Sequence, residues 1–459
     1  MRVAVVGCGY VGLTTAVGLA RAGHDVLAVE IADARLNDLR KGLLPFHEPT
    51  LSEPLLELVR TGRIRFTNDY QQVLPAELIF LCVETPSTPE GAIDLSPLRA
   101  AAREAAQALR EGAHHQVVVV RSTVVPGTTE NVLLPLLTEK TRGRSFPLGV
   151  VVNPEFLQEG QALTDFEHPG RIVIGSSDEA SADLVARVYS SLPAPVIRTN
   201  LATAELIKYV SNALLATLIS FSNQIALLCE ALPDVDVEEV LQAVHQDRRW
   251  LPLGADQSPA PPILAYLKAG CGYGGSCLPK DVKALIAFAG QRGAPVELLE
   301  AVDAVNARQP ARLVDLAEKI AGNLANKNVL LLGLGFKAGT DDTRESPGLR
   351  IAEELLRRRA RLFVSDPLVK PAQISSLLRA GAQFLEDPKA SFGQMDLCII
   401  STLSPEFQFV ADKLRAAVGT GPIVVDGRRL LARQAVLDSD RYVGVGWDRK
   451  LPKGPGGLP

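Results

Sequence analysis

After Met1 the chain reads RVAVVGCGYVGLTTAVGLAR (residues 2–21), which is a short apolar strand, a glycine loop and a helical pattern. In this context Gly7, Gly9 and Gly12 match the dinucleotide-binding fingerprint. The first glycine permits a tight turn, the second lets the backbone approach a pyrophosphate, and the third allows close packing of helix on strand. The helix start then faces the anion with its free N–H groups. A glycine turn that holds no nucleotide is the alternative.

A carboxylate at the end of the next predicted strand extends this site. Glu30 is placed to accept hydrogen bonds from both ribose hydroxyls of NAD, and its charge would repel the 2′-phosphate of NADP. The sequence therefore favours NAD as the cofactor, although Arg35 lies close enough to complicate that preference. The cofactor residues predicted in this region are Gly7, Gly9, Tyr10, Val11, Gly12, Glu30 and Arg35.

Strand and helix patterns alternate in both ends of the chain. Strands are predicted at residues 2–6, 25–30, 78–83, 116–121, 148–153 and 171–175, and again at 328–332, 361–365, 396–402 and 422–426. Repeated strand–helix units form a mostly parallel sheet with helices on both faces. Between the two series the hydrophobic period is helical. We therefore predict an α/β domain at residues 1–200, a helical middle at 201–305 and a second α/β domain at 306–459.

Composition bounds the class of protein. The 459 residues are 47% hydrophobic and 22% charged, as in a globular protein of two or three domains. A net charge of −4 gives no support for a nucleic-acid or anionic-membrane partner. No uninterrupted apolar run reaches the roughly 18 residues of a spanning helix, so we expect no membrane segment. The six cysteines form no CxxC pair and no cluster with histidine, which predicts no metal site and a reducing, cytoplasmic location.

A second glycine-rich stretch, GCGYGGSCLPKD (residues 270–281), points to the chemistry. Glycines in such number cost chain entropy and indicate a backbone that approaches a ligand closely. Pro279 suits the first turn of a helix, which places Cys277 near a helix N-terminus, where a thiolate is stabilised. Asp281 follows one turn later on the same face. We predict that Cys277 is a nucleophile; an inert buried thiol is the alternative, and Cys271 is the competing cysteine.

A third glycine loop, LLLGLGFKAGTDD (residues 330–342), looks similar to the first. Here Ala338 takes the place expected for the third glycine, and Lys337 enters the loop. A lysine suits a phosphate that is bound as a point charge. We interpret this loop as the nucleotide half of a substrate site, with a solvated surface lysine as the alternative.

The segment GCGYGGSCLPKD resembles the catalytic signature of the UDP-glucose/GDP-mannose 6-dehydrogenase family, and further segments match in the same order. They are residues 7–12, RSTVVPGTTE (121–130), NPEFLQEG (153–160), AELIKYVSNALLA (204–216), GFKAGTDDTRESP (335–347) and DGRR (426–429). The resemblance covers nearly the whole chain. It implies two Rossmann-like, doubly wound domains joined by a central helical domain with a long helix, and a homodimer through that middle.

The resemblance also implies roles for the matching residues. Catalytic roles fall to Cys277, Lys208, Asn212, Asp281, Glu155 and Thr123, and the cofactor site gains Thr85, Thr123, Glu159 and Arg344. The nucleotide sugar would be held by Glu155, Phe156, Lys208, Asn212, Arg249, Tyr266, Lys268, Gly274, Phe336, Lys337 and Arg428. Lys208 and Asn212 are four residues apart, so both leave one helix face. Such donors typically lower the barrier to an oxyanion by ~2.7–4 kcal/mol each.

The resulting hypothesis is an NAD-dependent, four-electron oxidation of a sugar alcohol to a carboxylate through a thioester on Cys277. A single-step alcohol dehydrogenase has no need of a nucleophilic thiol. The DGRR segment and Gly160 favour UDP-glucose, whereas HQDRR (245–249) and RSTVVPGT are also similar to GDP-mannose dehydrogenases. A protein that binds NAD and a nucleotide sugar without catalysis is a third alternative. The proline-rich residues 250–265 depart from the family pattern.

Overall fold

The chain folds into two compact α/β units. A computed structural model describes residues 1–250, 261–416, 420–431, 436 and 439–447. The first unit comprises residues 1–211 and 283–294, and the second comprises 212–282 and 295–459. Helices α8 (Leu201–Glu230) and α10 (Leu278–Gln291) contribute residues to both units. The α/β prediction is confirmed, whereas the three-domain division stays a prediction. Residues 251–260 of the proline-rich departure lie outside the described residues.

The first unit is built on an eight-stranded sheet in the order β3-β2-β1-β4-β5-β6-β7-β8. Its strands are β1 (Arg2–Val6), β2 (Asp25–Val29), β3 (Ile64–Thr67), β4 (Leu78–Leu81), β5 (Gln116–Val120), β6 (Leu148–Val152), β7 (Ile172–Ser176) and β8 (Val196–Thr199). All neighbours run parallel except β6 and β7, which are antiparallel. The six predicted strands are present. The sequence analysis missed β3 and β8, because these short edge strands each contain an arginine and lack a continuous apolar run.

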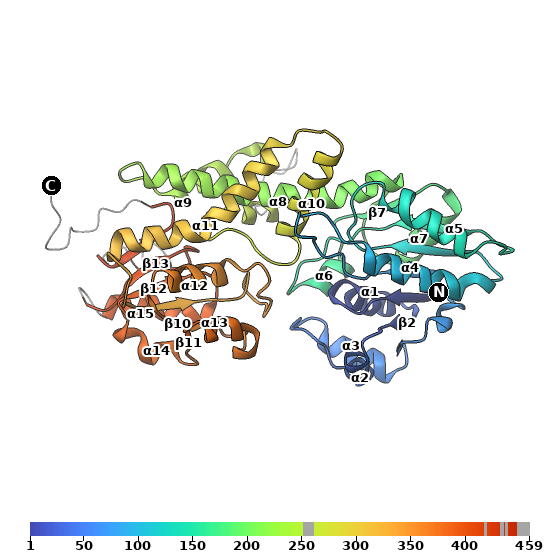
Figure 1. Cartoon of the computed structure of the whole chain (residues 1–459), viewed down its shortest axis with the longest axis horizontal. Coiled ribbons are helices and arrows are strands. Elements are labelled where there is room, and N and C mark those ends of the chain that lie inside the picture. Colours follow the sequence, from blue (N-terminus) through green and yellow to red (C-terminus); the bar gives the residue numbers. More distant parts are fainter. Residues whose placement is uncertain (251–260, 417–419, 432–435, 437–438, 448–459) are drawn as a thin grey trace. The chain divides into compact units, whose positions relative to one another are not determined.

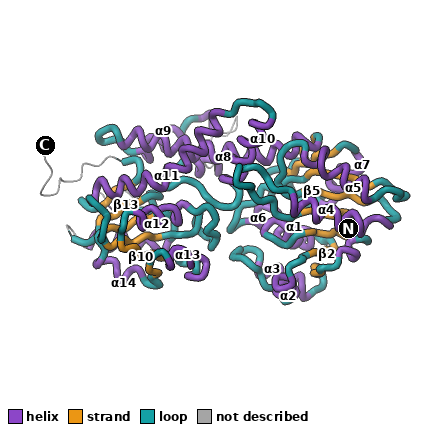
Figure 2. Tube along the Cα trace, in the orientation of Figure 1, coloured by secondary structure: helices purple, strands orange, loops and turns teal. Residues whose placement is uncertain are grey.

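Both faces of this sheet are buried, which explains the continuous apolar strands. Successive side chains point to opposite faces, so Val3 and Val5 enter one core while Ala4 and Val6 enter the other. The first core is completed by α1 (Tyr10–Arg21), α2 (Asp33–Arg40), α3 (Ser52–Arg60), α6 (Ala162–Glu167) and α7 (Glu179–Val188). The second is completed by α4 (Ser96–Ala108), α5 (Leu134–Lys140) and the start of α8. Figure 2 shows the strands of each sheet in orange among purple helices.

The second unit repeats this architecture with a six-stranded, all-parallel sheet in the order β11-β10-β9-β12-β13-β14. Its strands are β9 (Asn328–Leu332), β10 (Arg361–Ser365), β11 (Gln383–Phe384), β12 (Leu397–Ile400), β13 (Ile423–Asp426) and β14 (Tyr442–Gly444). Helices α12 (Pro347–Arg357), α13 (Ser375–Arg379), α14 (Pro388–Ser391) and α15 (Phe409–Ala416) surround it (Figure 1). The four predicted strands form its centre. Its order is that of the dinucleotide-binding fold, as in the first six strands of the other unit.

Three further helices belong with the second sheet. The end of α8 packs with α9 (Val237–His245) and α11 (Glu297–Ala321) in one core with Val329 and Leu331 of β9. Among the described residues, α8 is the one helix long and apolar enough to cross a membrane, with a mean hydropathy of 1.4 over its most apolar window. A core helix of a soluble protein passes the same test of length and composition, and 44% of that window is buried inside the protein.

Candidate active site

The loop between β1 and α1 has the geometry of the dinucleotide fingerprint. Gly7 has a φ of +92° and donates its N–H to the oxygen of Val29 at 2.9 Å. A Cβ on Gly12 would lie 1.8 Å from the oxygen of Gly7, so helix and strand approach closely enough to exclude any side chain. A Cβ on Gly9 would meet nothing within 4 Å, and Gly9 caps α1 without a side-chain bond. Tyr10 and Val11 form the first turn. The loop therefore leaves the helix N-terminus open, as a pyrophosphate requires.

Glu30 lies just after β2, at the predicted place. Its carboxylate is 5% exposed and accepts hydrogen bonds from the N–H of Ala32 at 2.8 Å and from Nη1 of Arg35 at 3.3 Å. Arg35 therefore balances part of the charge that would repel a 2′-phosphate. The carboxylate remains beside the glycine loop because β1 and β2 are neighbours.

The other predicted cofactor residues of this unit lie on loops at the ends of β4, β5 and β6. Thr85 donates its hydroxyl to the oxygen of Thr123 at 2.8 Å, which ties the loops after β4 and β5 together. The hydroxyl of Tyr10 donates to Glu48, which also accepts from the N–H of Gly160 at 2.7 Å. Glu159, next to Gly160, is half-buried. Glu48 was not predicted; it is buried and links the first glycine loop to the loop after β6.

Glu155 and Lys208 form a buried ion pair. Oε1 of Glu155 lies 2.9 Å from Nζ of Lys208, with both side chains 5% exposed. The other oxygen accepts from the N–H of Leu157 at 2.6 Å. Burial by itself raises the pKa of the Glu155 carboxyl, but the Lys208 charge and these hydrogen bonds outweigh it and hold the pKa below its ordinary value. The ring of Phe156 lies 5.6 Å from the Lys208 ammonium.

The second unit contains the cysteine loop (residues 270–281), and its two thiols differ in exposure. Cys277 is exposed and immediately precedes α10, whose first turn is closed by a 2.9 Å bond from the N–H of Asp281 to the oxygen of Cys277. Cys271 is buried and donates to the oxygen of Gly427 at 3.3 Å. Burial raises the pKa of the Cys271 thiol to about 11. Only the position of Cys277 suits a nucleophile.

Asn212 and Asp281 meet one turn after Cys277. Nδ2 of Asn212 donates to one oxygen of Asp281 at 2.6 Å, and Nζ of Lys280 pairs with the other at 2.6 Å. Asn212 is 8% exposed and Asp281 1%. The amide and carboxylate are therefore held in place by each other. Lys208 and Asn212 lie on one face of α8, as their spacing predicts.

Two loops of the second sheet enclose the cysteine loop. The N–H of Gly275 donates to the oxygen of Arg344 at 2.9 Å, and a Cβ on Gly274 would lie 2.3 Å from the oxygen of Glu345. A Cβ on Gly275 would lie 2.8 Å from the ring of Phe336. The ammonium of Lys337 is 5.8 Å from the same ring. The glycines of the cysteine loop therefore serve close contact with the loop after β9.

Arg428 packs against the cysteine loop at Gly270. It donates from Nε to the oxygen of Ser401 at 2.8 Å, and its side chain would lie 3.1 Å from a Cβ on Gly270. The predicted substrate residues Gly274, Phe336, Lys337 and Arg428 thus come together around the cysteine loop. They derive from three separate segments of the chain.

One interpretation of the loop after β9 is wrong. Ala338 does not stand in for the third glycine, because α12 begins only at Pro347 and Ala338 is exposed in the preceding loop. Gly348 has that function: a Cβ there would lie 2.6 Å from the oxygen of Gly333. The spacing of the first loop does not transfer, since this loop is far longer.

Arg344 meets the cysteine loop through its backbone oxygen, and the remaining predicted residues are Arg249, Tyr266 and Lys268. The Arg249 side chain is exposed and pairs with Asp247, two residues earlier. The Arg344 side chain is 63% exposed and pairs with Asp342. Tyr266 ends a short 3-10 helix, and the exposed Lys268 follows it. In the part of the chain that the structure describes, no group of three or more His, Cys, Asp or Glu side chains is arranged to hold a metal ion.

Two further buried charges escaped the sequence analysis. Glu205 of α8 accepts hydrogen bonds from the N–H groups of Gly127 at 2.5 Å and Thr129 at 2.8 Å, and so ties α8 to the loop after β5. Arg121 is 6% exposed at the end of β5. Both lie inside the matching segments AELIKYVSNALLA and RSTVVPGTTE, which is the signal that points to them.

Comparisons with known proteins cover nearly the whole chain. Residues 1–193 match the NAD binding domain of the UDP-glucose/GDP-mannose dehydrogenase family, residues 202–308 its central domain and residues 330–433 its UDP binding domain. UDP-glucose 6-dehydrogenase AglM of Haloferax volcanii is 36% identical, over 96% of this chain and 100% of that protein. GDP-mannose 6-dehydrogenase of Azotobacter vinelandii is 37% identical, over 93% and 96%. A solved UDP-glucose dehydrogenase from the hyperthermophilic archaeon Pyrobaculum islandicum is 38% identical, with a TM-score of 0.87 over 97% and 98% of the two chains.

Proposed function

The chain belongs to the UDP-glucose/GDP-mannose dehydrogenase family and is an NAD-dependent nucleotide-sugar 6-dehydrogenase; we propose that it oxidises UDP-glucose to UDP-glucuronate. One observation carries this proposal: Cys277 is exposed at the start of α10, on a loop enclosed by the residues proposed to hold the nucleotide. The DGRR segment and Gly160 favour UDP-glucose, and two of the three relatives compared are named for that substrate.

The first glycine loop fits NAD, because the N-terminus of α1 is uncapped and has open space beside Gly9. NAD supplies the acceptor for the hydride that leaves C6 of the sugar in each of two oxidations. Glu30 holds the ribose hydroxyls, and Thr85, Thr123, Glu159 and Arg344 complete the cofactor site in this proposal. The ordered loops after β4, β5 and β6 provide the rigid support that such a site needs.

Cys277 acts between the two oxidations. The first converts the C6 alcohol to an aldehyde, with loss of a hydride and a proton. The thiolate then adds to the aldehyde carbon, and the oxygen takes a proton, which gives a thiohemiacetal. Loss of the second hydride and that proton gives a thioester, and water releases the carboxylate and regenerates the thiol. The dipole of α10 favours the thiolate form that makes the attack.

Glu155 assists the water in the last step. The Lys208 charge outweighs burial and holds the pKa of Glu155 below its ordinary value, so the carboxylate is ionised at neutral pH and orients the water as a hydrogen-bond acceptor. Lys208 and Asn212 donate to the oxygen on C6 as it gains negative charge, and Asp281 handles the proton. Phe336, Lys337 and Arg428 hold the nucleotide, with Phe156, Gly274, Arg249, Tyr266 and Lys268 as the remaining substrate contacts.

Purified protein incubated with NAD and a panel of nucleotide sugars tests this proposal. We expect two NADH per uronate with UDP-glucose, measured by the absorbance of NADH and by mass spectrometry of the product. GDP-mannose is the second candidate substrate, since a GDP-mannose 6-dehydrogenase matches at 37% identity. If the protein oxidises GDP-mannose and not UDP-glucose, GDP-mannose is its substrate. Tight binding of nucleotide sugar without any NADH would indicate a non-catalytic binding protein.

We also propose a homodimer through α8. Its exposed side chains Leu206, Val210, Leu214, Phe221 and Leu228 are spaced four or seven residues apart and form one apolar face. Such a face is stabilised by a second copy of the chain. Phe221→Glu is expected to shift the mass in solution from dimer to monomer, measured by light scattering. An unchanged dimer would place the interface elsewhere. The free cysteines suit the reducing cytoplasm that we propose as its location.

A further inference from the structure

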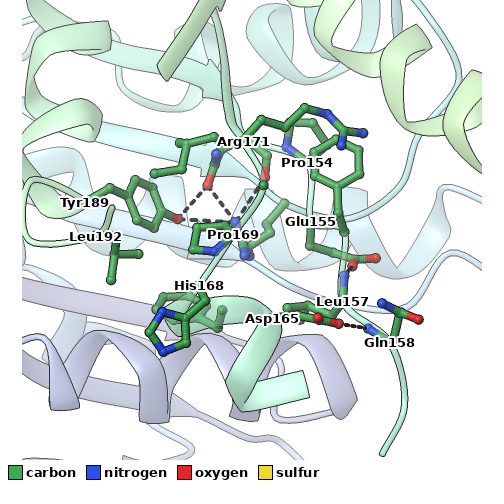
Figure 3. A pocket seen from close by; sticks show the side chains of 16 residues that line it. Pro154, Glu155, Leu157, Gln158, Asp165, His168, Pro169, Arg171, Tyr189 and Leu192 are labelled. Carbon is green, nitrogen blue, oxygen red and sulfur yellow. Dashed lines mark hydrogen bonds between the residues drawn. The ribbon is translucent and has the colours of Figure 1, made fainter. Parts of the chain in front are cut away.

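A cavity of about 200 Å³ lies in the first unit, below the loop that carries Glu155. It is bordered by the ends of β5 and β6, by α6, by the turn from α6 into β7, and by the segment after α7. This volume far exceeds the roughly 30 Å³ of one water molecule, and it is below the roughly 300 Å³ at which drug-sized pockets begin. The cavity therefore suits a small ligand. His168, Tyr189 and Leu192 line the part shown at the left of Figure 3, and none of them belongs to the proposed catalytic site.

Arg121 brings a buried positive charge to this cavity. Its Nε donates to the hydroxyl of Thr15 at 2.9 Å, and its Nη1 donates to Oδ1 of Asn153 at 2.6 Å and to the hydroxyl of Tyr189 at 3.2 Å. All these partners are neutral. No described carboxylate forms an ion pair with Arg121, and no described residue accepts a hydrogen bond from its Nη2. Glu155 is near enough for its charge to act on Arg121 but forms no direct ion pair with it, so an anion at Nη2 would stabilise this buried cation further.

A second guanidinium lines the same cavity. Arg171 is held by a 2.9 Å bond to the hydroxyl of Ser211, and its guanidinium carbon lies 3.8 Å from the ring centre of Phe156. It also forms no ion pair among the described residues. The lining also holds two carboxylates: Glu155 pairs with Lys208, and Asp165 keeps its negative charge while it accepts from the N–H of Gln158 at 2.8 Å. Two guanidinium groups and the Asp165 carboxylate therefore line the cavity, beside the Glu155–Lys208 pair.

We propose that this cavity, which shares Glu155 and Phe156 with the proposed substrate site, binds a small oxyanion such as inorganic phosphate. The planar fork of arginine presents paired N–H donors that match the oxygens of phosphate or carboxylate. Nη2 of Arg121 supplies such donors from a side chain whose other contacts fix its position. Arg171 supplies a second positive charge for the anion.

Gly170 offers a clean test, because it lines the cavity, is exposed, and has open space where a Cβ would stand. Gly170→Glu places a carboxylate beside the site, and Gly170→Gln is the matched neutral control of equal size. Phosphate is titrated into the full chain saturated with NAD, by calorimetry at constant ionic strength with chloride as reference. We expect one bound phosphate in the natural protein, similar affinity in Gly170→Gln, and affinity at least about tenfold weaker in Gly170→Glu.

Two outcomes overturn the proposal. One is the absence of saturable phosphate binding to the natural protein under these conditions. The other is phosphate affinity that is equal in the Glu and Gln variants, which places the anion elsewhere. Malonate in a parallel titration distinguishes carboxylate from phosphate as the preferred oxyanion. Circular dichroism of both variants confirms that each is folded, as the open space around Gly170 leads us to expect.

Discussion

The two sheets begin with the same turn and then use it differently. Gly7 and Gly333 have φ values of +92° and +101°, and each donates its N–H to the neighbouring strand at 2.9 Å, to Val29 and to Ser365. In the first unit, residues 7–9 alone separate β1 from α1. In the second, residues 333–346 separate β9 from α12. The short loop leads directly into a helix N-terminus, whereas the long loop packs against the loop that carries Cys277.

The helix N-termini explain the difference. Gly9 caps α1 with no side-chain bond, so its first N–H groups are available to a ligand. Ser346 caps α12 by accepting from the N–H of Gly348 at 3.1 Å, so protein satisfies that helix end. The acidic residues that follow β2 and β10 differ in the same way, because one is left open to a ligand and the other bonds to protein. Asp366 accepts four backbone N–H groups, from Leu334, Gly335, Leu368 and Val369, whereas Glu30 accepts one backbone N–H.

The largest expected effect concerns the thiol that the long loop supports. Cys277→Ser is expected to lower uronate formation by on the order of 10³-fold or more, the scale seen when a covalent nucleophile is removed. The measurement is product by mass spectrometry beside NADH. Cys271→Ser is the control and should retain most activity, because Cys271 is buried and bonded to a backbone oxygen. Normal uronate production by the Cys277 variant would refute the thioester.

Buried carboxylates in the two units should respond oppositely to pH. Glu155 has a lowered pKa, so its stabilisation is present above about pH 4.3, the ordinary glutamate value, and is lost as the pH falls through the folded value. Burial raises the pKa of Asp426, although backbone N–H groups oppose this, so its contribution is present below about pH 3.9 and is lost as the pH rises through the raised value.

Removing the cation of the Glu155 pair sharpens this contrast. Lys208→Met leaves the buried Glu155 carboxylate unpaired, so we expect about 3–5 kcal/mol less stability at pH 7, measured by urea unfolding. We expect a smaller loss at pH 5, because the unpaired Glu155 then gains a proton and loses its charge. Lys41→Met removes an exposed ion pair with Asp38 and should cost less than about 1 kcal/mol. A loss for Lys208→Met that does not change between pH 7 and pH 5 would show that Glu155 gains no proton.

Substitutions at Gly12 and Gly9 of the short loop test helix packing and ligand binding separately. Gly12→Ala introduces a Cβ 1.8 Å from backbone, and we expect about 1–3 kcal/mol of destabilisation, measured by thermal unfolding. Gly9→Ala meets open space, so the fold should be unaffected, while NAD affinity measured by fluorescence titration should fall about tenfold where the Cβ meets the pyrophosphate. Unchanged NAD affinity in Gly9→Ala would place the pyrophosphate elsewhere.

The smallest expected effect concerns Glu30 and Asp366, the acidic residues that follow β2 and β10. Glu30→Ala leaves Arg35 without its carboxylate, so we expect the ratio of NADP to NAD turnover to rise about tenfold, measured from kcat/KM for each cofactor. Asp366→Asn should leave that ratio unchanged and lower thermal stability, because its four hydrogen bonds serve the loop itself. A cofactor ratio that moved with Asp366 would break the comparison.

Much of the fold followed from local patterns, and the exceptions have a physical reason. The central strands are continuous apolar runs because both faces of a parallel sheet are buried. The edge strands β3, β8, β11 and β14 lack such runs because they are short or partly exposed. Gly348 was missed because the third glycine is defined by where the helix begins, and the length of the intervening loop is not a local property.

By itself, the sequence determined the two α/β sheets, the first glycine loop with its acid, and the candidate nucleophile in its glycine-rich loop, because each depends on residues close together in the chain. Only the tertiary structure showed that Cys277 is exposed and Cys271 buried, paired Glu155 with Lys208 and Asn212 with Asp281, and brought the substrate loops around the cysteine. Burial and ion pairing are set by neighbours that are distant in sequence. The spacing of such distant residues along the chain does not show which of their side chains will come into contact.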